Sequence, residues 1–590
     1  YAPGFFESTV EQIRGALAKF IDKPKPGAGK AWLEEFSETM KGDAEASPLL
    51  RQLQSLTRAG KPRLHLHGDY NAGKSSFIKR VLIDAGLPVP QDLAVRADPT
   101  TAKVSSYDWL GIELVDSPGF QSGRDEDTLA AVRASPDASF ILYLFQPNLV
   151  TGSVEALQSV LKGDESTGFI SKLNRTFFII NRADELGVDP AEDLEGFTHL
   201  CDRKRTELIQ ALGSQGLDVS PDRVFCMASD PYGLAGDRRD LNSTHFDPFR
   251  PWDGHRALAE AFRKVRPELI RVGCDISVLE GGAARVAQLS ITLKERLKRL
   301  QQERGLVARI QTAVDDALDE GRRVSEHVEG ALQKAIDEHA YRLLGETFSA
   351  VDEAELEALA KQLAQWWKDK AFVADVERWH SDSRKTIDEW AERVQDEVGR
   401  RFGSAEFAAT FPELTQKFEA ETLSPKKKGT AATILEALSK PLQMSGSRDV
   451  VYEIGKFIGV NFRPWGAIKW AGYFGKANVV LAAGGIALDV ADWWSANKNE
   501  AKRESARANA RTFVNKTAAQ YRLQLLRGDG GPSAYFDANR SAMVKHRDAL
   551  AAEVSRLDAD ARALQARIDG CVRLWDSARN HLGMESRHGK

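Results

Sequence analysis

Residues 68–75 decide the fold that this sequence predicts, and they read Gly68-Asp69-Tyr70-Asn71-Ala72-Gly73-Lys74-Ser75. The pattern is G-x-x-x-x-G-K-S, in which the glycines let backbone N–H groups surround a polyphosphate with no Cβ in the way. Lys74 is expected to reach the β- and γ-phosphates, and the Ser75 hydroxyl is expected to hold Mg²⁺. Ser76 follows directly and is included with the loop among the residues expected to bind nucleotide.

The segments on both sides of this loop have the structure that a phosphate site needs. Residues 63–67 alternate apolar and polar side chains and predict a short strand, whereas residues 76–82 predict a helix. A helix that begins at the loop adds unpaired N–H groups and the positive end of its dipole, and both favour phosphate. The sequence therefore predicts a nucleotide site at residues 68–76.

Length, charge and cysteine content restrict the remaining possibilities. At 590 residues with a net charge of −4, the chain should form about three to four units and has no overall positive field, so nucleic-acid binding is not expected. The four cysteines form no C-x-x-C pair, which favours reduced thiols over structural zinc. No secretory signal is recognisable at the start, and no run of about 20 apolar residues exists. We therefore expect a cytoplasmic protein, with peripheral attachment to the inner membrane left open.

The amino-terminal part of the chain contains two predicted regions. Residues 1–59 carry apolar side chains at helical spacing and are expected to form helices that pack on a neck or stalk. Residues 60–250 alternate strands and helices, which predicts a mainly parallel sheet. Besides the strand before the loop, buried strands are expected at residues 112–115, 139–145, 176–180 and 223–227.

The rest of the chain is predicted to be helical. From Val286 to Ile336 apolar residues recur every three or four positions with charges between them, which is typical of a long helix with a coiled-coil-like seam. A similar stripe runs from Leu550 to Trp575, so we expect the two helices to pair as an antiparallel stalk. This part is divided into a neck and stalk at 251–425, a tip at 426–495 and returning stalk helices at 496–590.

The tip has an unusual composition. It begins with the basic run Lys426–Lys428, and its residues 454–488 contain four Lys or Arg and six aromatic side chains but no acidic residue. Aromatic rings favour the headgroup layer of a membrane, and basic side chains can extend to lipid phosphates. We interpret this stretch as a membrane paddle that contacts anionic lipid. The alternative is a buried helical hairpin at the end of the stalk.

Two further motifs follow the loop in the order that a guanine-nucleotide site requires. Asp116-Ser117-Pro118-Gly119 follows a predicted strand and matches D-x-x-G. Asp116 is expected to hold Mg²⁺ through water, and the Gly119 N–H is expected to meet the γ-phosphate. Asn181-Arg182-Ala183-Asp184 follows the next predicted strand but one and matches N-K-x-D, with Arg182 in place of Lys. The Asp184 carboxylate can accept from two N–H donors that guanine has and adenine lacks.

Two weaker signals complete the predicted site. Ser229 follows the strand expected at 223–227, where a backbone N–H would contact the guanine O6. Thr100 and Thr101 lie between the loop and the D-x-x-G motif, where a threonine would complete the Mg²⁺ shell, and we favour Thr101.

Each signal taken alone has a plainer interpretation. Asp116 suits a turn at a strand end, and residues 181–184 suit a helix cap. His65 and His67 beside the loop are interpreted as packing residues rather than metal ligands. The motifs occur in the expected order, however, and each follows a predicted strand, which favours a nucleotide site.

This set of motifs resembles the GTPases of the dynamin superfamily. The residues that carry the resemblance are Gly68–Ser75, Thr100 and Thr101, Asp116–Gly119 and Asn181–Asp184. The order of amino-terminal helices, GTPase domain, long stalk, apolar tip and returning helix is similar as well. Within the superfamily the chain most resembles the LeoA kind of bacterial dynamin-like GTPase. The resemblance implies an α/β P-loop GTPase domain with a mainly parallel sheet, joined to an extended all-α stalk or bundle with an apolar helical tip.

The resemblance also implies an activity and partners. GTP would be hydrolysed to GDP and phosphate, with Mg²⁺ bound by Ser75, Thr101 and Asp116. Water would attack the γ-phosphate in line, while Lys74, Mg²⁺ and backbone N–H groups stabilise the developing charge. Slow basal turnover would rise when two GTPase domains meet across the nucleotide. The implied partners are a second copy of the chain, another dynamin-like protein and an anionic lipid membrane.

The loop departs from that of dynamins proper at two positions. Where dynamins carry Gln-Ser, this chain has Tyr70-Asn71, and Tyr70 lacks the amide that helps to place the attacking water. Asn71 resembles the loop Asn of potassium-stimulated GTPases, so we hypothesise that K⁺ supplies the charge of an arginine finger. The alternative is that Asn71 only caps the loop. We therefore expect Asn71, Lys74, Ser75 and Thr101 to act in catalysis. EHD-type membrane ATPases have a similar loop and use ATP, which leaves the base preference open.

Two functions of different classes fit these observations. The first is a mechanochemical, membrane-associated GTPase in which nucleotide-driven pairing of GTPase domains moves the stalk. The alternative is a regulatory GTPase switch that does not bind membranes and whose helical arm holds a protein or ribosomal partner. The composition of residues 454–488, and the response of GTP turnover to lipid, distinguish the two.

Overall fold

The computed structural model describes residues 24–68, 71–90, 93, 105–116, 137–149, 157–158, 161–162, 170–236, 238–349, 353–416, 447–456, 500–528 and 530–584. The chain forms two compact units. We name them the sheet unit, Tyr1–Arg296 with Ala563–Lys590, and the helical unit, Leu297–Arg562. The expectations for residues 1–23, and for the tip at 426–446 and 457–495, concern residues outside these ranges.

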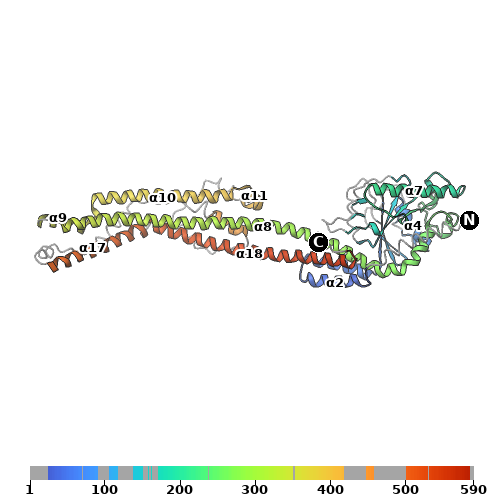
Figure 1. The fold of residues 1–590 in the computed structure, drawn as a ribbon, viewed down its shortest axis with the longest axis horizontal. Helices are drawn as coiled ribbons and strands as arrows, with labels where there is room; N and C mark the ends of the chain where they lie inside the picture. The colour runs from blue at the N-terminus through green and yellow to red at the C-terminus, as the bar shows by residue number, and fades with distance from the viewer. Residues whose placement is uncertain are drawn as a thin grey trace. The chain divides into compact units, whose positions relative to one another are not determined.

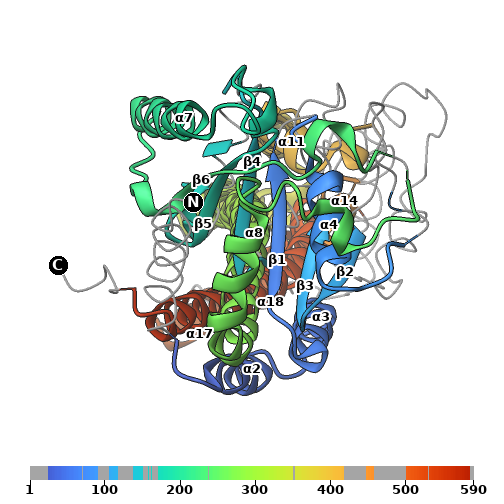
Figure 2. The same ribbon diagram turned by 90° about the vertical axis from the view of Figure 1, so that its right-hand side faces the viewer.

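The sheet unit contains a six-stranded sheet in the order β2-β3-β1-β4-β5-β6 (Figure 2). Every neighbouring pair is parallel except β2 and β3, which are antiparallel. The strands are β1 Arg63–Gly68, β2 Ser105–Trp109, β3 Ile112–Asp116, β4 Phe140–Phe145, β5 Thr176–Ile180 and β6 Val224–Cys226. The prediction of a mainly parallel sheet is confirmed, and the five predicted strands agree with the structure to within one residue at each end.

Strand β2 is the one strand of this sheet that the sequence did not predict. It pairs with β3 through a tight turn in which Leu110 and Gly111 both have positive φ, 54° and 83°. Two successive positive φ angles are typical of a type I′ hairpin turn, which follows the twist of the strands. Only Tyr107 and Trp109 of this strand are buried apolar residues, so the hydrophobic run was too weak to recognise.

Helices cover both faces of the sheet. On one face, the core joins residues of α4 (Lys74–Asp84) and of the start of α8 (His255–Phe348) to apolar residues of β1 and β4. On the other face, α7 (Leu194–Ser214) contributes Leu208 and Leu212 to a core with β4 and β5. Strands β4 and β5 are buried along their whole length, as expected for strands covered on both sides.

The amino-terminal helices α2 (Ala28–Thr39) and α3 (Ala46–Ala59) belong to the sheet unit as well. The Trp32 indole N–H of α2 donates to the Leu574 carbonyl oxygen of α18 (Pro532–His581) at 2.8 Å. The Gly29 N–H donates to the Asp275 carboxylate of α8 at 2.9 Å. Helix α2 therefore lies against residues that are more than 240 and 540 positions away in the sequence.

In the helical unit, α8 and α18 pair in opposite directions, as the two apolar stripes predicted (Figure 1). Arg304 pairs with Asp558 at 3.0 Å, and Glu329 accepts from the Ser533 hydroxyl at 2.8 Å. Between these two contacts the residue number rises along α8 and falls by the same amount along α18, as expected for an antiparallel pair of helices. The other α-helices described in this unit are α9 Glu353–Ala364, α10 Lys370–Phe402, α11 Ala405–Thr410, α14 Ser447–Lys456 and α17 Glu500–Arg527.

The core of the helical unit is rich in aromatic residues. Trp366 contacts the rings of Phe372 and Tyr521, with centroid distances of 5.0 and 6.0 Å. The Trp366 indole N–H donates to the Thr517 hydroxyl, and that of Trp379 donates to the Val328 carbonyl oxygen. These two buried indole groups therefore have polar partners, which avoids the cost of leaving a donor unpaired. Among the residues described, no helix has the length and apolar character needed to cross a bilayer.

Candidate nucleotide-binding site

The phosphate loop connects β1 to α4 at the carboxyl end of β1. Gly68 and Gly73 both have positive φ, 148° and 79°. A Cβ at Gly68 would overlap the Leu144 carbonyl, and a Cβ at Gly73 would overlap the Asn181 side-chain amide. Both glycines are therefore required by close approach as well as by backbone conformation. Asp69 and Tyr70 lie outside the described residues.

Lys74 is the first residue of α4, and its side chain bends back over the loop. Its Nζ donates to the Gly68 carbonyl oxygen at 3.0 Å, and the residue is 9% exposed. Ser75 and Ser76 follow in the first turn of the helix and are partly buried. Asn71 is exposed and has a φ of 60°, a left-handed conformation that asparagine adopts more readily than most residues. The loop thus presents an ammonium group and a helix amino terminus to the same region.

Asp116 ends the neighbouring strand β3 and is 2% exposed. It is in register with Leu66 of β1, two residues before the loop begins. The predicted Mg²⁺ residue therefore lies beside the phosphate loop. The other predicted residues of this region, Thr100, Thr101 and Gly119, lie outside the described residues.

Asn181 follows β5 and links the loop to β6. Its Nδ2 donates to the Ala72 carbonyl oxygen at 2.9 Å and to that of Gly73 at 3.3 Å. Its Oδ1 accepts from the Ser229 N–H at 3.1 Å. All of these groups are buried or nearly so, which makes each hydrogen bond costly to lose. The side chain therefore holds two loops together rather than pointing at solvent.

Asp184 lies close to this junction and is only partly buried. Its carboxylate accepts from the Tyr232 N–H at 2.8 Å, and burial raises the pKa of the carboxyl group, which that hydrogen bond opposes. Tyr232 itself has a φ of 52° and is 53% exposed, and its hydroxyl donates to Asp189 at 2.6 Å. Arg182, also with a positive φ, forms an ion pair with Glu185.

The structure brings Lys74, Asp116, Asn181, Asp184 and Ser229 to one edge of the sheet. They follow or end β1, β3, β5 and β6, and the carboxyl ends of parallel strands meet at the same edge. In open α/β sheets this edge is where ligands bind. The sequence predicted these positions because each polar motif follows a buried apolar run.

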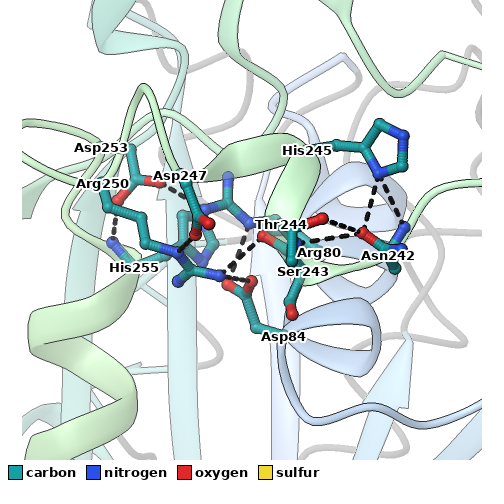
Figure 3. Close-up of polar contacts among 10 residues, drawn as sticks. All are labelled: Arg80, Asp84, Asn242, Ser243, Thr244, His245, Asp247, Arg250, Asp253 and His255. Atoms are coloured by element: carbon teal, nitrogen blue, oxygen red, sulfur yellow. Dashed lines mark hydrogen bonds and ion pairs between the residues drawn. The ribbon is translucent and has the colours of Figure 1, made fainter.

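The sequence did not predict a second group of residues, which support the segments at this edge of the sheet. Arg80 of α4 is buried and forms ion pairs with Asp253 and with Asp84, the latter at 2.9 Å (Figure 3). His255 begins α8, and its Nε2 lies 3.0 Å from the Ser229 hydroxyl. Burial lowers the pKa of His255 well below its usual range, and the positive charges of Arg80 and Arg250 act in the same direction. The His255 imidazole is therefore neutral at pH 7.

The strand order and the phosphate loop at the end of the first strand define an α/β P-loop domain, which is joined to a helical unit. The helical part has its own match. Residues 384–562 match the family model for a dynamin-like helical domain. This match agrees with the predicted resemblance and shows that the helical part of the chain is dynamin-like over those residues.

Comparison with solved structures gives distant similarities. The chain is similar to the LeoA bacterial dynamin GTPase from ETEC at 17% identity, over 97% of this chain and 99% of that chain, with a TM-score of 0.32. It is also similar, at 11% identity over 94% and 95% of the two chains and a TM-score of 0.42, to an oligomerised bacterial dynamin pair that provides a mechanism for the long range sensing and tethering of membranes. Toc33 from Arabidopsis thaliana in complex with GDP and Mg²⁺ is 12% identical over 42% of this chain and 95% of that chain, with a TM-score of 0.23.

No curated relative matches the chain in a sequence comparison. The α/β P-loop fold of the sheet unit follows from its strand order and from the geometry of the phosphate loop.

Proposed function

We propose that this chain is a dynamin-like GTPase that binds GTP and Mg²⁺ at the carboxyl edge of its sheet and hydrolyses GTP to GDP and phosphate. The observation that carries the proposal is the placement of Lys74, Asp116 and Asn181 at the carboxyl ends of β1, β3 and β5, with Asn181 hydrogen-bonded to the loop that leads to Lys74. Turn and cap roles for these residues do not account for their convergence on one phosphate loop.

The residues present fit a triphosphate and its metal. Gly68 and Gly73 keep side chains out of the loop, and Lys74 supplies a positive charge inside it. Ser75 and Asp116 supply the oxygen donors that Mg²⁺ prefers, and Thr101 is proposed as a third. When bound, Mg²⁺ would neutralise charge on the β- and γ-phosphate oxygens.

Guanine is the base that this site is proposed to select. Asn181 positions the segment, and Asp184 would accept from the two N–H donors that distinguish guanine from adenine. The aliphatic stem of Arg182 is proposed to lie along the base. A site built around such paired hydrogen bonds rejects a base that leaves them unmade.

The proposal is tested by calorimetry and phosphate release. We expect the wild-type protein to bind GTP more tightly than ATP. Lys74→Ala should abolish phosphate release, because no other described cation lies inside the loop, and Asp184→Asn should weaken GTP binding by at least about tenfold. His199→Ala, a change of an exposed residue on α7, serves as the matched control. Full phosphate release by Lys74→Ala, or no GTP binding by the wild type, would show the proposal to be wrong.

A monovalent cation is proposed to assist the reaction at Asn71. Asn71→Gly is the informative variant, because glycine keeps the positive φ while the side-chain oxygen is removed. If K⁺ binds there, wild-type turnover should be faster in K⁺ than in Na⁺ buffer, and Asn71→Gly should lose that difference while it keeps its GDP affinity. Equal wild-type rates in the two buffers would leave Asn71 with a capping role only.

We also propose that the chain works as a mechanochemical protein at a membrane. GTP-driven pairing of domains from two copies, or from this chain and another dynamin-like protein, would move the helical part. We propose a GTPase domain at 60–250, a neck and stalk at 251–425, a membrane-contacting tip at 426–495 and returning stalk helices at 496–590, with the helices of residues 1–59 packing on the neck or stalk. Support for the lipid contact comes from the composition of residues 454–488, which lack acidic side chains.

Liposome co-sedimentation tests the lipid contact separately. Wild-type protein should pellet with vesicles that contain anionic lipid, and a Trp465→Glu/Trp470→Glu double variant should pellet less. GTP turnover should be measured on the same samples, because GTPase activity without lipid binding would favour the regulatory switch. Equal pelleting of the two proteins would rule out these residues as the membrane contact.

A further inference from the structure

The first residue of the long helix α8 contacts the segment proposed to recognise the nucleotide base. His255 is 2% exposed, and its Nε2 lies 3.0 Å from the Ser229 hydroxyl oxygen. Ser229 is 1% exposed and follows β6. The two residues are thus joined by a buried hydrogen bond, and buried hydrogen bonds are costly to leave half made.

Ser229 is held from two sides. Its backbone N–H donates to Asn181 Oδ1 at 3.1 Å, while its hydroxyl group bonds His255. Asn181 in turn donates to the Ala72 carbonyl oxygen of the phosphate loop at 2.9 Å. A continuous series of hydrogen bonds therefore runs from the phosphate loop through Asn181 and Ser229 to the start of α8.

His255 is itself fixed by the turn that precedes it. The Asp253 carboxylate accepts from the His255 N–H at 3.0 Å, and the Asp253 carbonyl oxygen accepts from the Ala228 N–H at 3.0 Å. Gly254 has a φ of 76°, and a Cβ there would lie 2.9 Å from the Cys226 carbonyl oxygen. The turn can approach β6 this closely only because residue 254 is glycine.

The helix that follows the phosphate loop supports the same turn. Arg80 of α4 pairs with the Asp253 carboxylate (Figure 3), and the Phe77 ring of α4 packs on the His255 ring with centroids 5.5 Å apart. Arg80 and Asp253 are both buried, so either charge would be costly to leave alone. His255 is therefore held by β6, by its own turn and by α4.

We propose that His255 is a positioning residue for nucleotide binding, acting through Ser229 and Asn181 to keep the base-recognition segment aligned with the phosphate loop. The inference rests on the proposed function, because it assigns a role within the same site. It also makes the start of α8 part of the nucleotide site, since the residue that fixes Ser229 is the residue at which the helix begins.

Two substitutions separate the hydrogen bond from the packing. His255→Phe keeps a ring against Phe77 but cannot bond Ser229, whereas His255→Gln keeps an amide near the position of Nε2 but loses the ring. If the hydrogen bond positions Ser229, His255→Phe should weaken GDP affinity by about tenfold, because fewer molecules hold the binding arrangement. His255→Gln should bind GDP within about twofold of wild type, even if its melting temperature is lower.

A double-mutant cycle identifies the path. Ser229→Ala keeps the backbone N–H that Asn181 accepts but removes the hydroxyl group. It should weaken GDP affinity as much as His255→Phe does, and the double variant should be no weaker than either single variant. His199→Phe on α7 makes the same change at an exposed histidine and should leave GDP affinity unchanged. Additive losses in the double variant would overturn the proposal, as would normal GDP affinity in His255→Phe.

Amide hydrogen exchange gives a readout that needs no nucleotide. The Ser229 N–H should exchange faster in His255→Phe than in wild type or in His255→Gln. Without the bond to His255, Ser229 would be held less firmly, and its N–H would donate to Asn181 for less of the time. If the wild type bound neither GDP nor GTP, the proposed function would fail, yet this comparison would still decide the role of His255. Unchanged protection of Ser229 in His255→Phe would overturn it.

Discussion

Gly73 shows how tightly single residues are constrained at the edge of the sheet. Its φ is 79°, and a Cβ there would overlap the Asn181 amide that bonds the loop. Gly86, at the other end of α4, has a similar φ of 65°, but a Cβ there would meet no atom within 4 Å. Both glycines therefore have a left-handed backbone conformation, and they differ only in the atoms that an added Cβ would meet.

We expect Gly73→Ala to abolish GDP binding, because it displaces Asn181, and to cost more stability than the left-handed backbone alone. Gly86→Ala should keep normal GDP affinity and lose about 1–2 kcal/mol of unfolding free energy from backbone strain. Calorimetry with GDP and denaturant unfolding measure the two effects. Equal GDP affinity in the two variants would contradict the role given to Asn181.

The pH dependence of base recognition is predicted from Asp184. Burial raises the pKa of this carboxyl group, so it becomes protonated at a higher pH than an unperturbed aspartate does. The ionised form is needed to accept from both guanine donors. As pH falls through the raised pKa, GDP affinity should therefore decrease, by up to about tenfold per pH unit below it.

Titration of GDP affinity from neutral to acidic pH measures this effect. Asp184→Asn is the control, because its titration reports the phosphate groups and all other sites but not this carboxyl group. The difference between the two titrations belongs to Asp184. A difference that stays constant down to the ordinary aspartate pKa of about 4 would contradict the prediction.

The sequence predicted the site residues that lie within one continuous motif. It did not predict the residues that reach the site through long-range packing. Asn181 and Asp184 were predicted because they follow a buried strand in one recognisable motif. His255 and Tyr232 reach the same region through turns that are distant in sequence, at Gly254 and after Pro231. No local sequence pattern predicts such contacts, because they depend on how closely one backbone segment approaches another.

Among the elements, α8 departs most from its sequence pattern. The neck and stalk were predicted to be helical from residue 251, with a regular apolar stripe only from Val286, and in the structure one helix runs on from His255 and includes Pro267. Proline usually ends or bends a helix because it lacks an N–H, so the sequence pattern does not predict that one continuous helix passes through this position. Side chains at the start of α8 pack on the sheet instead of forming the seam, which explains the change of pattern before Val286.

Two glycines on α8 allow a paired prediction. A Cβ at Gly282 would overlap the Trp32 ring of α2, whereas nothing lies within 4 Å at Gly330. Alanine favours a helix over glycine by up to about 1 kcal/mol, so Gly330→Ala should stabilise the protein by that amount. Gly282→Ala should instead lose about 1–3 kcal/mol, because the indole must move.

Denaturant unfolding of the two variants and the wild type measures whether each substitution raises or lowers the free energy of unfolding. The substitution and the helix are the same in each case, so only the neighbour differs. If Gly282→Ala were as stable as Gly330→Ala, α2 would not pack on α8 as described.

For the whole molecule, the division into two compact units has a thermodynamic consequence. Each unit has its own apolar core, and the proposed nucleotide residues all belong to the sheet unit. A ligand stabilises only what it binds, by about 2.7 kcal/mol at a concentration a hundred times its dissociation constant. We expect two unfolding transitions in calorimetry. GDP with Mg²⁺ should raise the midpoint temperature of one of them by roughly 5–10 °C.

The transition that GDP leaves unchanged should be altered by a helical-unit substitution such as Trp366→Ala, which removes a buried indole. A single transition that GDP shifts as a whole would show that the two units unfold together. The helical unit was predictable because its two apolar stripes are long and regular. The aromatic contacts among Trp366, α10 and α17 were not, because they join short segments with no shared pattern.

The bond between Trp32 and the Leu574 carbonyl oxygen has a consequence for biosynthesis. A ribosome makes the donor of this bond long before the acceptor, because the two residues are 542 positions apart. While all of those residues are being added, the indole of α2 must remain without its final partner. This corner of the protein can therefore be completed only after α18 has left the ribosome, and a nascent chain stalled before that point would expose an apolar face for chaperones to bind.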